Sequence, residues 1–312
     1  MDTDSACVDK AHKRLLEYIA SINTGLHTPY CDAVLTLGVQ SPRASAYLPL
    51  LLAEPFQINE PFIVNEAAFA NLCLDVFSRA VDCCTDNPKG SDPILIHLGS
   101  LCMGKAVQIY GNLLPRGDGF WKYWEQYLKE ASLSEQFLWR HRGSFVPFGE
   151  DDFAMQGTKS SLIKVSAALY ASLTNRWGIL DEIEIGLNAI ATGVQIIDDL
   201  LDWEEDLGAR IYTFPLVLGQ RNRIRGQSLA QSVNSPYVVT VVLRTAMDNL
   251  EIGKQHFEKV NASSMVSFID ALLRSIREAE VYVERLPDCK VKDCETFVIR
   301  HLHRIISPRL AH

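Results

Sequence analysis

The chain has 312 residues, of which 47% are apolar and 22% are charged, and its formal net charge is −8. This length and apolar content suffice for a large core, and an acidic chain without a basic stripe argues against a nucleic-acid partner. No apolar run approaches the roughly 18 residues that a membrane-spanning helix needs, so we expect no membrane span. The first ten residues, MDTDSACVDK, are too polar for a secretory signal, and the sequence predicts a cytoplasmic protein.

Eight cysteines are scattered along the chain, and no two of them form a CxxC pair. In a chain of this length, scattered cysteines indicate reduced thiols rather than a disulfide framework, in agreement with a cytoplasmic location. Cys289 and Cys294 lie near His301 and His303, but their spacing fits no usual zinc pattern, which leaves a zinc site as a minor alternative.

Helical periodicity extends through most of the chain, and segments rich in Gly and Pro interrupt it. In the first half we expect helices over residues 5–22, 30–54, 60–84, 93–114 and 121–142. A polar connection is expected over 142–158, and further helices over 159–177, 180–207, 235–260 and 263–286. Short helices are expected within 210–225 and 294–306. No useful strand-period alternation is present, so the sequence predicts one all-α domain over residues 1–312 with about ten helices.

The functional prediction depends on the acidic stretch Gly193–Pro215. Its residues Asp198, Asp199 and Asp202 stand at positions i, i+1 and i+4, which we expect to fall on nearly one face of a helix, with Asp206 close behind. Carboxylates this close repel one another unless a cation lies between them. Mg²⁺ suits this position because it takes hard oxygen ligands and completes its shell with water and substrate phosphates. The alternative is an ordinary solvated acidic face.

This stretch resembles the second aspartate-rich motif of trans-isoprenyl diphosphate synthases, the polyprenyl synthetase-like relatives of class I terpene synthases. The family motif runs FQ-x-x-DD-x-x-D, followed by an acidic residue, G-K/R and T-x-P. The matching residues here are Gln195, Asp198, Asp199, Asp202, Asp206, Gly208, Arg210, Thr213 and Pro215. The resemblance implies a class I isoprenoid synthase-like helical bundle around a central cavity and, by analogy with the fold, a homodimer.

The resemblance also implies a first motif, DD-x-x-D, well upstream of the second. The best candidate is Asp82-Cys83-Cys84-Thr85-Asp86, which keeps the first and last aspartates and has Cys83 in place of the second. Asp82 and Asp86 are one helical turn apart and could bind the same Mg²⁺ ions. The alternative is a pair of ordinary aspartates at a helix end, and Asp75 is a weaker alternative start of the motif.

Four further residues are candidates for contact with the substrate. Lys159, followed by Ser160, resembles the family's K-T/S segment, whose lysine holds diphosphate, although such a lysine is often a surface residue. By the resemblance, Arg210 and Gln195 of the second motif belong to the same set. Arg79 lies one turn before the first motif and could contact phosphate. The acidic run 150–152 is interpreted as a solvated loop and helix cap.

Part of the family pattern is missing, and this decides between related activities. Chain-elongating members have a basic G-G-K-R segment and an Arg pair that bind a second diphosphate, whereas here only Arg43 and Lys89 could replace them. A diphosphate needs several charge-assisted donors, so the second substrate site is weakened.

These departures favour a Mg²⁺-dependent class I terpene synthase, which converts one allylic prenyl diphosphate to a terpene and releases pyrophosphate. Two alternatives stay open: a chain-elongating trans-prenyltransferase of the farnesyl or geranylgeranyl diphosphate synthase type, and a non-catalytic partner subunit. The catalytic residues that the resemblance implies are Asp82, Asp86, Asp198, Asp199 and Asp202. All of these except Asp199 are expected to bind the metal.

Overall fold

The computed structural model describes residues 2–22, 44–86, 92–115 and 117–285. These residues form thirteen α-helices and three 3-10 turns, and their one β-bridge joins Arg142 to Ile211. The prediction of an all-α fold is therefore confirmed for this part of the chain. No helix in the described ranges is both long and apolar enough to cross a bilayer.

The chain divides into two compact units. The first unit comprises residues 1–124 and 162–180, and the second unit comprises residues 125–161 and 181–312. Helix α6 (Phe120–Leu138) begins in the first unit and continues in the second. The prediction of one domain over residues 1–312, organised around a central cavity, stays a prediction.

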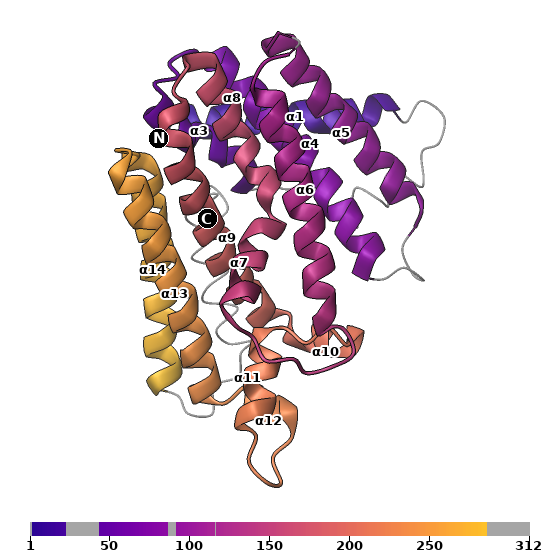
Figure 1. Ribbon diagram of the computed structural model, residues 1–312, viewed down its shortest axis with the longest axis vertical. Helices are drawn as coiled ribbons and strands as arrows, with labels where there is room; N and C mark the ends of the chain where they lie inside the picture. The colour runs from indigo at the N-terminus through magenta and orange to yellow at the C-terminus, as the bar shows by residue number, and fades with distance from the viewer. Residues whose placement is uncertain (1, 23–43, 87–91, 116, 286–312) are drawn as a thin grey trace. The chain divides into compact units, whose positions relative to one another are not determined.

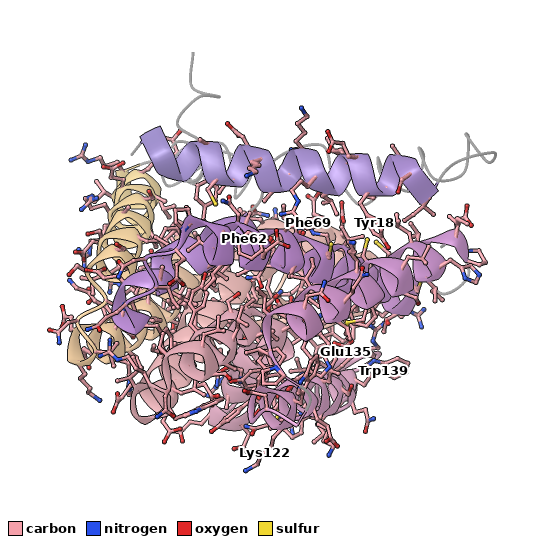
Figure 2. The ribbon with its side chains drawn as sticks, turned by 90° about the horizontal axis from the view of Figure 1, so that it is seen from above. Tyr18, Phe62, Phe69, Lys122, Glu135 and Trp139 are labelled. Atoms are coloured by element: carbon pink, nitrogen blue, oxygen red, sulfur yellow. The ribbon has the colours of Figure 1, made fainter. Side chains whose placement is uncertain are left out.

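In the first unit, α4 is the helix on which the others pack. It contacts α5 most extensively, and α1 and α3 also lie against it. Figure 2 shows α1 along α4, with Tyr18 labelled on the former and Phe69 on the latter. Arg14 of α1 pairs with Glu66 of α4 at 2.6 Å. The helices of this unit are α1 (Asp2–Ile22), α3 (Ala44–Phe56), α4 (Pro61–Asp86), α5 (Ile94–Leu113) and α8 (Val165–Thr174).

In the second unit, α9 and α13 approach each other closely because glycines line their contact. A Cβ atom on Gly193 would lie 2.9 Å from the Ala246 carbonyl oxygen, and one on Gly253 would lie 3.0 Å from the Gly186 oxygen. Helix α14 runs beside α13, as the orange and yellow ribbons of Figure 1 show. The helices of this unit are α7 (Glu150–Lys159), α9 (Leu180–Leu201), α10 (Trp203–Ala209), α11 (Phe214–Asn222), α12 (Leu229–Val233), α13 (Pro236–Lys259) and α14 (Ser263–Arg285).

Helix ends that carry strong capping signals lie where the sequence predicts them. The Ser235 hydroxyl accepts a hydrogen bond from the Val238 amide at 3.4 Å, and Pro236 occupies the first turn of α13. Helix α14 covers 263–285, against a predicted 263–286. The predicted helix over 294–306, the cysteine and histidine residues near it, and most of the predicted helix over 30–54 lie outside the described residues.

Three predicted helix boundaries between residues 142 and 207 are wrong. The expected polar connection over 142–158 contains α7, and Lys159 ends that helix instead of beginning the next one. The expected long helix over 180–207 ends at Leu201, because Asp202 leaves helical geometry (φ −97°, ψ 11°) and becomes the N-cap residue of α10. Short helices such as α7, α10 and α12 explain why the described residues contain more helices than predicted.

Candidate functional site

The predicted aspartates lie at the junction of α9 and α10, but they do not share one face. Asp198 is exposed, whereas only 5% of Asp199 is exposed. Adjacent residues of an α-helix differ in direction by about 100°, which turns Asp199 towards the interior. Asp202 keeps its one-turn relation to Asp198, since its amide donates to the Asp198 carbonyl oxygen at 2.9 Å. Asp198 and Asp202 therefore form the exposed pair, and Asp199 lies behind them.

Asp199 is held by two glutamine side chains from two helices. The Gln195 Nε2 atom donates to its Oδ1 atom at 2.8 Å, and the Gln156 Nε2 atom donates to its Oδ2 atom at 2.8 Å. Burial raises the pKa of Asp199 to about 7, and the negative charge of Asp198 adds to this rise, while both amides and the charge of Lys159 act against it. Neutral amides orient this carboxylate without cancelling its charge.

Asp206 joins the same electrostatic group. Burial raises its pKa to about 8, with further rises from the charges of Asp199, Asp202 and Asp198. The Thr213 hydroxyl donates to the Asp206 Oδ2 atom at 3.1 Å and partly opposes the shift. The pKa of Asp198 is also raised, because protein packed around its exposed side chain desolvates the carboxyl group. We call Asp198, Asp199, Asp202 and Asp206 the acid cluster.

Lys159, at the end of α7, is the cation beside the acid cluster. Its charge lowers the pKa of both Asp198 and Asp199. Its Nζ atom also lies 3.4 Å from the Glu135 Oε2 atom, on α6; Glu135 is labelled in Figure 2. The expected role of Lys159 in holding diphosphate stays a prediction.

A close contact between α7 and α9 brings Lys159 to this position. A Cβ atom on Gly157 would lie 2.6 Å from both the Asn188 carbonyl oxygen and the Thr192 hydroxyl oxygen. That hydroxyl group donates to the Phe153 carbonyl oxygen at 3.0 Å. No side chain larger than hydrogen fits between the helices at Gly157. Helix α7 therefore lies close to α9, and this places Gln156 and Lys159 beside the acid cluster.

Backbone hydrogen bonds hold Arg210 next to Asp206. Arg210 adopts a left-handed conformation (φ +59°) after α10, and the following amide, of Ile211, donates to the Asp206 carbonyl oxygen at 2.8 Å. The Gly143 amide donates to the Arg210 carbonyl oxygen at 2.8 Å, and the Tyr212 amide donates to the His141 oxygen at 3.0 Å. The loop after α6 thus fixes this segment, and the Arg210 side chain is exposed.

Asp152 is buried, so the interpretation of the acidic run 150–152 as a solvated loop is wrong at this residue, whereas its interpretation as a helix cap is confirmed at the start of α7. Its Oδ1 atom lies 3.1 Å from Arg140 Nε and 2.6 Å from His141 Nε2, and its Oδ2 atom accepts from the Gly149 amide at 2.8 Å. Burial would raise the pKa of Asp152, but the hydrogen bonds from Arg140 and His141 outweigh it and lower the pKa. Asp152 thereby fixes the start of α7 and the loop before it.

The first-motif candidate lies at the end of α4, in the first unit. Asp82 is half-buried in the last turns of that helix. Asp86 is the final residue of α4, and its side chain lies outside the described residues. Arg79 points its Nε atom at Asp75 Oδ2, 3.3 Å away, so this guanidinium already has a carboxylate partner one turn along its own helix.

The acid cluster suits Mg²⁺ by the chemistry of its donors. In the part of the chain that the structure describes, no three His, Cys, Asp or Glu side chains form a complete metal-binding group. Mg²⁺ does not require one, because it usually keeps several waters and binds one or two carboxylates together with phosphates. The charges of Asp198, Asp199 and Asp202 raise the pKa of Asp206, and carboxylates that repel one another in this way are a favourable place for a cation.

The second unit therefore collects Asp198, Asp199, Asp202, Gln195, Lys159 and Arg210 from the predicted set. Sequence reasoning missed Gln156, which comes from a different helix, and it missed the burial of Asp152. A signal for α7 was present, since three acidic residues in succession after a glycine are typical of a first helical turn. Comparison with known protein families finds no family that matches the chain, and a search of curated proteins finds no matching relative.

Proposed function

We propose that this protein is a Mg²⁺-dependent class I terpene synthase. It ionises an allylic prenyl diphosphate, converts the carbocation to a terpene and releases pyrophosphate. One observation carries the proposal: the exposed Asp198 and Asp202 lie one helical turn apart where α9 meets α10, with Asp199 and Asp206 close enough that the charges of Asp198, Asp199 and Asp202 raise the pKa of Asp206. Such a site attracts divalent cations, and a lysine next to the cations is suited to bind the phosphate groups that they bring.

Each residue has a distinct role in the proposed reaction. The resemblance implies that Asp198 and Asp202, and also Asp82 and Asp86, would hold Mg²⁺. Bound Mg²⁺ supplies Lewis-acid neutralisation of the charge on the diphosphate.

The remaining residues of the predicted set act on the diphosphate or on the acid cluster. Lys159 and Arg210 bind the departing pyrophosphate through charge-assisted hydrogen bonds. Gln195 orients Asp199 behind the exposed pair. Arg79 would contact the substrate through its guanidinium group, whose Nε atom also pairs with Asp75.

The test is a panel of incubations with the full chain and Mg²⁺. Geranyl, farnesyl and geranylgeranyl diphosphate are each supplied with and without isopentenyl diphosphate, and products are identified by gas chromatography with mass spectrometry. We expect a terpene hydrocarbon or alcohol from one allylic diphosphate alone and no product when the metal is chelated.

Other outcomes of the panel would replace the proposal. Longer prenyl diphosphates that form only with isopentenyl diphosphate would identify a chain-elongating prenyltransferase. No turnover in any combination would favour a non-catalytic partner subunit. Light scattering on the purified chain tests the homodimer that we propose by analogy.

A further inference from the structure

The two hydrogen bonds that hold Asp199 come from different parts of the chain. Gln195 lies one turn before Asp199 on the same helix, so its bond is local. Gln156 lies on α7, 43 residues away in sequence, and is itself buried. Gln156 is therefore the link through which α7 fixes the acid cluster.

The kind of donor matters for a cation site. Asp152, which is also buried, is held by Arg140 and His141, whose hydrogen bonds lower its pKa. Asp199 receives only side-chain amides, which are neutral donors. Amides fix the direction of a carboxylate while leaving its negative charge available to attract a cation nearby.

Gln156 also carries an unmet hydrogen-bonding group. Its Oε1 atom is buried and has no hydrogen-bond partner among the described residues. An unsatisfied buried acceptor is destabilising, so the bond that Gln156 donates to Asp199 is kept at a cost to the stability of the fold. The adjacent Gly157 keeps α7 in its close contact with α9, which holds the Gln156 amide within 2.8 Å of Asp199.

We propose that Gln156 is a positioning residue: by fixing Asp199 together with Gln195, it holds the turn in which Asp198 and Asp202 receive a divalent cation. This role rests on the proposed function, because it assumes that the acid cluster binds metal. Asp199 lies within the turn that the Asp202 amide closes on the Asp198 carbonyl oxygen, so holding its side chain from two helices restrains the turn that connects the exposed pair.

The test measures Mn²⁺ binding, which does not depend on turnover. Mn²⁺ with inorganic pyrophosphate is titrated into the full chain and followed by electron paramagnetic resonance. The variants are Gln156→Leu, Asp199→Asn and the double variant. The matched control is Gln126→Leu, because the Gln126 Nε2 atom also donates to a carboxylate at 2.8 Å, that of Glu130 on α6. Circular dichroism confirms that each variant is folded.

We expect Gln156→Leu to weaken Mn²⁺ binding about tenfold and Gln126→Leu to leave it within about twofold. If Gln156 acts through Asp199, then Gln156→Leu should have less than a twofold further effect in the Asp199→Asn background, because the two changes remove the same contact. This non-additivity is the signature of positioning, since a purely structural contribution would be the same in both backgrounds.

Two contrary results have different meanings. If the wild-type chain binds Mn²⁺ and Gln156→Leu binds it equally well, or if the effects add fully in the double variant, the positioning role is refuted while the proposed function stands. If the wild-type chain binds no Mn²⁺ in the presence of pyrophosphate, the proposed function is refuted, and the role of Gln156 with it.

Discussion

Two buried aspartates of the second unit, Asp152 and Asp199, show how differently the same side chain can be used. Asp152 is held by Arg140 and His141, and its pKa is lowered. Asp199 is held by two amides, and its pKa is raised to about 7. The first aspartate has its charge compensated and stabilises the fold. The ionised form of the second is not compensated by any cation bonded to it among the described residues, so burial makes that form costly, which is characteristic of a functional site.

The largest effect that we predict is on catalysis, from Asp198→Asn. If Asp198 holds the metal, kcat should fall by about 10²–10³-fold or more, as when a preorganised electrostatic contact is removed. The melting temperature should not fall, because the substitution removes one of several mutually repelling charges. The control is Glu205→Gln, an exposed acid in the same segment, which should retain activity. Equal activity of wild type and Asp198→Asn would show that the site is elsewhere.

A chain stabilised by paired carboxylates becomes more stable as the pH rises. The raised pKa values of Asp199 and Asp206 predict the opposite dependence for this chain. Asp199 and Asp206 bind a proton more tightly in the folded than in the unfolded chain. Between about pH 4 and pH 8 the folded state therefore holds more protons, and the free energy of unfolding falls as the pH rises. We expect a loss on the order of 4–6 kcal/mol between pH 5 and pH 8 from the two groups together.

Denaturant unfolding at several pH values measures this loss in the free energy of unfolding. The same measurement with metal present provides the contrast. Mg²⁺ with pyrophosphate should stabilise the chain more at pH 8 than at pH 5, because the ionised carboxylates are the ligands. Asp206→Asn should flatten the pH dependence. A stability that rises steadily from pH 5 to pH 8 in the absence of metal would contradict the raised pKa values.

The contacts of Asp152 with Arg140 and His141 predict that Asp152→Asn lowers the stability of the fold. The substitution leaves Arg140 and His141 without their buried carboxylate, and we expect a destabilisation of about 2–3 kcal/mol. The neighbouring Asp151→Asn is the control, since Asp151 is exposed and should change stability by less than about 0.5 kcal/mol. Thermal unfolding that does not distinguish the two variants would mean that Asp152 has no compensating role.

A smaller effect is expected where α7 meets α9. In Gly157→Ala the new methyl group would lie 2.6 Å from the Asn188 carbonyl oxygen, so α7 must shift, at a cost of about 1–2 kcal/mol. Because Gln156 and Lys159 move with α7, pyrophosphate affinity should also fall. Gly104→Ala, in open space on α5, should instead stabilise by about 0.5–1 kcal/mol. Differential scanning calorimetry measures the stability of both variants, and isothermal titration calorimetry measures their affinity for pyrophosphate.

Sequence patterns sufficed for the parts of this molecule that local physics determines. The start of α13 follows from Ser235 and Pro236, which cap a helix wherever they occur. The break at Asp202 carries no such signal, because an acidic run predicts a continuous helix equally well.

Contacts between distant segments could not be predicted. The bond from Gln156 to Asp199 joins residues 43 positions apart, and the salt bridge of Asp152 depends on a loop folding back from the end of α6. Charge pattern located the candidate site, whereas tertiary packing decided which aspartates face solvent and which are held inside.

The most direct test of the central claim is a crystal structure of the chain with Mn²⁺ and pyrophosphate, with the metal located by its anomalous scattering. We predict Mn²⁺ on Asp198 and Asp202, with pyrophosphate against Lys159. Manganese bound away from the acid cluster, or pyrophosphate bound without contact to Lys159, would contradict the claim.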